Sequence, residues 1–183
     1  MTTSLSNHFC AMARNNAWSN DRLHRACADL NPEEFAAERV SFFPSIRQTL
    51  NHILVVDRYY LADLKGTGRI ILEDEVPFSD PAQLAASQAE FDRELIAFCE
   101  SLEDVDMDRM IRIDRGDGTV SEESVGAVLA HLFVHQIHHR GQAHAMLAGT
   151  RVPPPQLDEF FLAADAPLRE SELNRLGIAG PGN

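Results

Sequence analysis

The histidines of this chain are concentrated in one short segment. Five of the eight lie within HLFVHQIHHRGQAHAM, residues 131–146. Neutral imidazole is a ligand for zinc, nickel and iron, and two histidines four residues apart stack on the same side of a helix. The segment therefore either presents histidines to solvent or uses some of them to hold a metal ion.

A helical wheel separates these histidines from one another. One apolar face is defined by Val125, Val128, Leu129, Leu132, Ala143, Met146 and Leu147. His139 falls within this face and His135 lies at its edge, so this pair can face the interior together. His131 and His138 lie further round the helix, and His144 is well off the face. Spacing alone leaves two other pairs possible. His131 and His135 are four residues apart, and His135 and His138 are three apart.

Two histidines are too few to bind a metal ion tightly, so a third ligand must come from another helix. The best candidate is His52, in RQTLNHILVVDRYYL. It flanks the main apolar stripe of its own helix, which consists of Ile46, Leu50, Ile53, Leu61 and Leu64. A helix in a bundle contacts two neighbours, which allows a second buried face. The residues alone do not decide between this site and histidines that simply lie on helix surfaces.

The sequence lacks the motifs of several other classes of enzyme and binding protein. The sequence has no Glu-x-x-His pair of the ferritin-like di-iron type, no HExxH, no GxSxG and no glycine-rich phosphate loop. The net charge of −12 and the scattered Lys and Arg residues argue against binding to nucleic acid or an anionic membrane.

The sequence also indicates a cytoplasmic location. No apolar run approaches the ~20 residues that would span a bilayer, and no signal peptide is recognisable. Cys10, Cys27 and Cys99 form no CxxC pair, so we expect reduced thiols in the core.

The apolar periodicity predicts four long helices, at about residues 4–30, 44–65, 80–102 and 121–148, with a capping-type start at Ser121 for the last. Alternation in MIRIDRGDGTV, residues 110–120, predicts a small β-hairpin around Gly116-Asp117-Gly118. Short helices are expected near 157–163 and 168–176, followed by a disordered GIAGPGN end. The prediction is an all-α four-helix bundle, residues 1–165, followed by a short helix and tail, residues 166–183.

Three segments together resemble the DinB/YfiT-like metalloenzyme superfamily, which is distinct from the DNA polymerase that shares the name DinB. They are HLFVHQIHHRGQAHAML, TLNHILVVDRYYL and the early NNAWSNDRL, and the resemblance covers roughly residues 8–163. It implies an up-down-down-up bundle that is commonly a homodimer. It also implies one divalent ion per chain, zinc or nickel foremost and iron or manganese as alternatives, held by His52, His135 and His139.

The resemblance extends to function. The wider superfamily includes bacillithiol S-transferases and mycothiol-dependent maleylpyruvate isomerases, which implies a metal-dependent enzyme that activates a small thiol or water. Three imidazoles leave an open coordination position, as catalytic sites do. The alternatives are a non-catalytic metal-binding stress-response protein with a structural ion, and a plain helical dimerisation module.

Other residues near the histidines carry separate expectations. Arg140, Gly141 and Gln142 also match the motif of the superfamily. We expect Arg140 to be a structural ion-pair partner, and Gly141 to mark close helix packing. Asp57 is a candidate to support the metal ligands.

Overall fold

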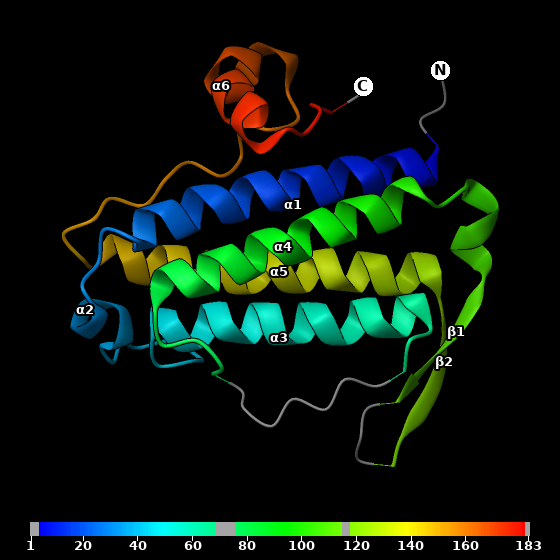
Figure 1. Ribbon diagram of the computed structural model, residues 1–183, viewed down its shortest axis with the longest axis horizontal. Coiled ribbons are helices and arrows are strands. Elements are labelled where there is room, and N and C mark those ends of the chain that lie inside the picture. The colour runs from blue at the N-terminus through cyan, green and yellow to red at the C-terminus, as the bar shows by residue number, and fades with distance from the viewer. Residues whose placement is uncertain (1–3, 69–75, 115–117, 182–183) are drawn as a thin grey trace.

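Four long helices form a bundle in the computed structural model, which describes residues 4–68, 76–114 and 118–181 (Figure 1). They are α1 (Leu5–Cys27), α3 (Ile46–Lys65), α4 (Pro81–Glu100) and α5 (Val125–Ala148). Helices α1 and α5 run in one direction and α3 and α4 in the other. The predicted up-down-down-up bundle is therefore confirmed. The two most extensive interfaces join α1 to α4 and α3 to α5.

Each long helix begins at a side chain that caps its free backbone N–H groups. Ser4, Ser45, Asp80 and Ser124 each accept a hydrogen bond from the first turn of the helix that follows. Helix α3 ends at Gly66, whose φ of 66° lies in the left-handed region that favours glycine. These local signals give the helices the lengths that the bundle requires.

The small hairpin is present, although its second strand is longer than predicted. Strand β1 (Met110–Asp114) pairs antiparallel with β2 (Val120–Ser124). Residues 116 and 117 of the expected turn lie outside the described residues. Ser121 pairs with Ile113 in the sheet, so it does not start the last helix. That helix begins at Val125 because Ser124 provides the cap.

Shorter helical segments connect and follow the bundle. They are α2 (Pro32–Ala36), η1 (Asp104–Asp108), η2 (Ala163–Asp165) and α6 (Ala166–Leu176). The predicted helix at 157–163 is wrong, because residues 153–160 have no regular structure.

The C-terminal segment packs on the outside of α1. Phe160 and Leu173 form a small cluster with Trp18, and the rings of Trp18 and Phe160 are 5.7 Å apart between centroids. Ile178 packs against this cluster and against the main core. The expectation of a disordered end is therefore wrong as far as residue 181. The division of the chain after residue 165 remains a prediction.

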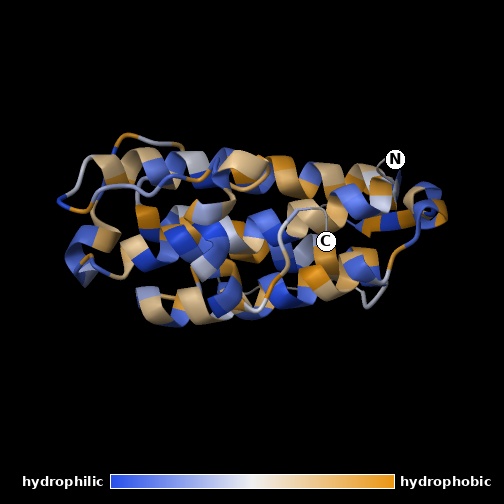
Figure 2. Cartoon of the chain, turned by 90° about the horizontal axis from the view of Figure 1, so that it is seen from above, coloured by the Kyte–Doolittle hydropathy of each residue, from blue (hydrophilic) through white to orange (hydrophobic). Residues whose placement is uncertain are grey.

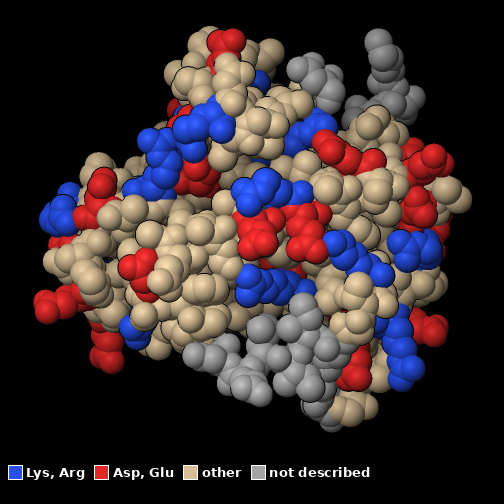
Figure 3. All heavy atoms as spheres, in the orientation of Figure 1, with Lys and Arg blue, Asp and Glu red and all other residues tan. Residues whose placement is uncertain are grey.

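The main core lies between the four helices. Hydrophobic and hydrophilic residues alternate along them (Figure 2), and the predicted stripe of α3 is fully buried. Cys27 and Cys99 are core residues, while Cys10 is half-buried. No helix in the described part of the chain is long and apolar enough to cross a membrane. On the face shown in Figure 3, basic side chains are interspersed with acidic ones.

Candidate metal centre

Three histidines from two helices meet at the interface of α3 and α5. They are His52 from α3 and His135 and His139 from α5, the residues expected from the sequence. The Nε2 atoms of His52 and His135 are 3.1 Å apart. One ring nitrogen from each of the three lies within 4.8 Å of the others. Antiparallel packing of α3 on α5 thus brings together side chains that are 83 positions apart in the sequence.

The other histidines of the motif lie elsewhere. His131 and His138 are exposed, as the helical wheel predicts. The ring of His144 is turned toward the following loop, where its Nε2 lies 2.9 Å from the carbonyl oxygen of Pro155. None of the three belongs to the group whose nitrogens converge.

Gln142 fixes the orientation of the His139 ring. Its Oε1 is 2.8 Å from Nδ1 of His139, and its amide nitrogen donates to Nε2 of His138 at 3.1 Å. Because Oε1 can only accept, Nδ1 of His139 carries the proton and Nε2 keeps its lone pair. Metal-binding histidines usually donate their second ring N–H to such an acceptor. The role of Gln142, which the motif left open, is thus to position His139.

Burial keeps the three imidazoles neutral. Desolvation, together with the neighbouring histidines, lowers the pKa of His52 to about 4 and that of His135 to about 3. Desolvation also lowers the pKa of His139, although Gln142 opposes this change. Neutral imidazole is the protonation state that a metal ion requires. The donor set therefore fits a divalent ion that accepts nitrogen ligands.

Two phenylalanines lie beside the histidines. The ring of Phe43 is 4.3 Å from that of His52 and 5.5 Å from that of His139, between centroids. Phe42 packs against Phe43 and is 77 % exposed. These residues occupy an irregular segment before α3, where no periodic pattern could reveal their position in advance. They form an apolar wall next to the convergent nitrogens.

Asp57 does not support the histidines as hypothesised. Its carboxylate is completely buried and accepts a hydrogen bond from Nε2 of Gln88 at 3.1 Å. Among the described residues, no hydrogen bond joins Asp57 to His52, His135 or His139, and no fourth His, Cys, Asp or Glu joins their group.

A buried polar network continues from the histidines into the bundle. Arg140, which follows His139, is 4 % exposed and donates to Oδ1 of Asn16 at 2.6 Å and of Asn20 at 2.8 Å. The amide nitrogens of both asparagines donate to Asp92, each at 3.1 Å. The network thus ties α5 to α1 and α4 through side chains that sequence reasoning did not connect.

Arg140 is buried, but among the described residues its side chain forms no ion pair, and its hydrogen bonds go to amide oxygens. Its expected role as a structural ion-pair partner remains a prediction. Burial lowers its pKa to about 10, against the opposing effect of Asp92 and Asp57, so it stays charged at neutral pH. Burial raises the pKa of Asp92 to about 6 and also raises that of Asp57. The guanidinium therefore compensates two carboxyl groups that have been removed from water.

The expectation for Gly141 is wrong. A Cβ atom built on this residue would meet nothing within 4 Å. No helix in the described part of the chain packs closely against it. Its lack of a side chain therefore has no explanation in the packing of the described residues.

Replacing Gln142 with leucine is expected to weaken zinc binding about 10- to 100-fold, because Nδ1 of His139 loses its acceptor. Glutamate at the same position keeps an acceptor and is the matched control, so Gln142→Glu should retain at least the original affinity. Competition with a chromophoric chelator measures both constants. Wild-type affinity in Gln142→Leu would show that the ring of His139 needs no such support.

Comparison with known proteins gives a consistent picture. A family model described as the DinB family matches residues 1–171. Protein DinB of Bacillus subtilis (strain 168) is 25% identical over 142 residues, which cover 72% of this chain and 80% of that protein. The crystal structure of a DinB-like protein from Bacillus cereus ATCC 10987 superposes with a TM-score of 0.59. That match, at 16% identity, covers 76% of this chain and 90% of the other, and it concerns the fold alone.

Proposed function

This chain belongs to the DinB family, and we propose that it binds one divalent ion through His52, His135 and His139 and acts as a metal-dependent enzyme on a small thiol or water. The carrying observation is the convergence of three neutral imidazoles without a fourth protein ligand in the described part of the chain. Structural zinc sites have four protein ligands, whereas catalytic sites have three and keep one position open.

The donor set favours zinc or nickel, with iron and manganese as alternatives. A divalent ion bound by neutral ligands supplies Lewis acidity that lowers the pKa of a thiol or water. The chain itself keeps the histidines neutral and holds His139 through Gln142. Phe42 and Phe43 cover one side of the site and offer an apolar surface for the rest of a substrate.

The alternative is a non-catalytic metal-binding protein whose ion mainly stabilises the bundle. The position of the histidines argues against it. His52 and His135 are only half-buried, while the core of the bundle is closed by fully buried residues such as Leu54, Leu129 and Leu132. We therefore expect the chain to remain folded without the ion, although with lower stability.

A cobalt-substituted sample separates the two functions. If a coordination position is open, adding 2-mercaptoethanol should change the visible absorption, because sulfur replaces oxygen in the ligand field. Ethanol at the same concentration is the control and should leave the spectrum unchanged. A spectrum that ignores the thiol, together with unfolding of the chain on chelation, would favour the structural ion.

We further propose that two copies pair through the outer face of α5. Apart from His131 and His138, its exposed positions are all small or apolar: Ala127, Ala130, Val134, Ile137, Gly141, Ala145 and Ala148. Val134 is 65 % and Ile137 51 % exposed, and Arg140, the one charged residue of α5, is buried. An uncharged face suits contact between two copies that each carry a charge of −12.

Sedimentation velocity tests this pairing. Ile137→Glu should shift the protein toward the monomer, because the contact would bury an unpaired charge. Leu168→Glu places the same charge on an exposed position of α6 and should leave the association unchanged. A monomeric wild-type protein would refute the proposal.

A further inference from the structure

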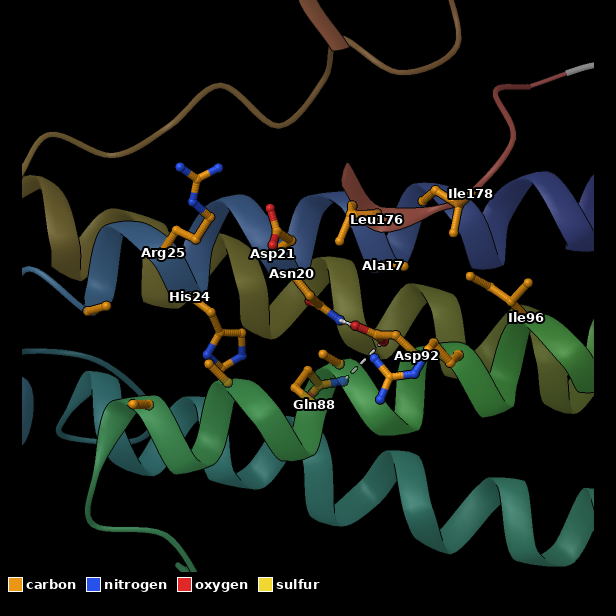
Figure 4. A pocket seen from close by; sticks show the side chains of 15 residues that line it. Ala17, Asn20, Asp21, His24, Arg25, Gln88, Asp92, Ile96, Leu176 and Ile178 are labelled. Carbon is orange, nitrogen blue, oxygen red and sulfur yellow. Dashed lines mark hydrogen bonds between the residues drawn. The ribbon is translucent and has the colours of Figure 1, made fainter. Parts of the chain in front are cut away.

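A cavity of about 250 Å³ lies between α1 and α4, away from the α3–α5 interface that holds the three histidines. Short side chains create this space, because alanine methyl groups do not fill the gap between two helices. The alanines that line the cavity are Ala17, Ala28, Ala82, Ala85 and Ala89. Ile96 and, from the C-terminal segment, Leu176 and Ile178 complete an apolar wall (Figure 4).

One end of the cavity is polar and buried. His24 and Asn20 of α1 face Gln88 and Asp92 of α4 across it (Figure 4). The exposed fractions of these side chains are 5 % or less. The ring of His24 points from α1 toward α4, and Asn20 is bound to Asp92. Burial lowers the pKa of His24 to about 4, so the ring is neutral at pH 7.

Two groups at this end lack hydrogen-bond partners among the described residues. Oε1 of Gln88 is buried without a donor. The ring of His24 lines the cavity and forms no hydrogen bond with the described residues. Buried polar groups in folded proteins are nearly always satisfied, by the protein, by water or by a ligand. The volume exceeds what one or two waters need, at about 30 Å³ each. It approaches the lower end of small-molecule pockets.

The side chains that line the polar end indicate which kind of ligand would fit the cavity. The Gln88 oxygen and the Asp92 carboxylate are acceptors, and neutral His24 offers one acceptor nitrogen. Asp21 and Arg25 point away from the polar end, and Asp21 is paired with Arg175. Arg93 also lines the cavity, at an exposed position of α4. The carboxylate of Asp92 at the polar end disfavours an anion there.

We propose that this cavity binds a small uncharged molecule with an apolar ring or chain and one hydrogen-bond donor. The apolar part lies along the alanine wall, and the donor reaches His24 or Gln88. The site does not depend on the metal centre. Phenol is a suitable probe, because it has a ring and one O–H group, and toluene is its isostere without the donor.

Titration of the ¹⁵N-labelled protein with phenol tests the proposal. Saturable shifts are expected in the amides of α1 and α4 around the cavity, with a dissociation constant in the range of about 1 mM that suits so small a ligand. Toluene should bind at least about tenfold more weakly, because it leaves the acceptors unsatisfied.

Two neighbouring alanines provide matched variants. Ala85 lines the cavity, and Ala86 is exposed on the same helix. Ala85→Leu should fill the space and abolish the shifts, while Ala86→Leu should retain them. Zinc binding, measured in both variants, reports whether the bundle has kept its fold. Absence of saturable shifts in the wild-type protein, equal shifts in both variants, or toluene binding as tightly as phenol would each overturn the proposal.

Discussion

Replacing either His135 or His139 with alanine is expected to reduce the zinc affinity by more than about 100-fold, beyond the loss typical of an outer-shell partner. Two remaining imidazoles are too few to hold the ion tightly. His52→Ala should have the same effect, because His52 supplies the third nitrogen. Competition with a chelator of known affinity measures the loss, and circular dichroism checks that each variant is folded.

The neighbouring histidines are matched controls on the same helix. His138→Ala and His144→Ala should each change the affinity by less than about tenfold, since they affect at most the surroundings of a ligand. His138 accepts from the amide nitrogen of Gln142, and its ring lies 4.8 Å from that of His139 between centroids, but its nitrogens do not join the converging group. His144 lies beside Pro155. A His138→Ala variant as impaired as His139→Ala would contradict the assignment of the ligands.

The second large effect is expected at Arg140. Replacement by methionine should destabilise the chain by about 3–5 kcal/mol, because it leaves buried carboxyl groups without their cation. It also removes the N–H group that donates to Oδ1 of Asn16 and of Asn20. The free energy of unfolding from urea titration measures this loss. Arg25→Met, at an exposed position of α1, should change stability by less than about 0.5 kcal/mol.

The loss in Arg140→Met should also depend on pH. Burial raises the pKa of Asp92 to about 6, and removal of the guanidinium would raise it further. In the unfolded chain the pKa of an aspartate is about 3.9. Between the two values the folded state binds more protons, so its stability increases as the pH falls. The deficit against the wild-type protein should therefore be smaller at pH 5.5 than at pH 7.5. An equal deficit at both values would contradict the network.

Local patterns explain why so much of the fold could be predicted. Apolar periodicity identified the four long helices, and their observed ends include the Asp80 cap of α4 and Gly66 after α3. The wheel also placed His139 inside and His138 outside, because burial on a helix follows its period. The helix expected near residue 157 failed, since Phe160 packs on Trp18 from an irregular segment. That contact depends on tertiary packing.

The candidate site was only partly predictable. His52 joins the α5 histidines through the pairing of two helices far apart in sequence. The residues alone made it a candidate ligand, and the family resemblance singled it out. Phe42 and Phe43 carried no signal at all. The buried network does have a signal in the sequence. Polar pairs four residues apart occur on three helices. They are Asn16 with Asn20, Gln88 with Asp92, and Gln136 with Arg140. Such pairs share a helix face.

X-ray absorption spectroscopy of the wild-type protein loaded with one equivalent of zinc tests the central claim most directly. We expect about one ion retained per chain, with three imidazole nitrogens at about 2.0–2.1 Å and the remaining coordination from oxygen. The His139→Ala variant should retain no ion under the same dialysis. Two tightly held ions per chain, a sulfur ligand in the absence of added thiol, or fewer than three imidazoles would contradict the three-histidine site.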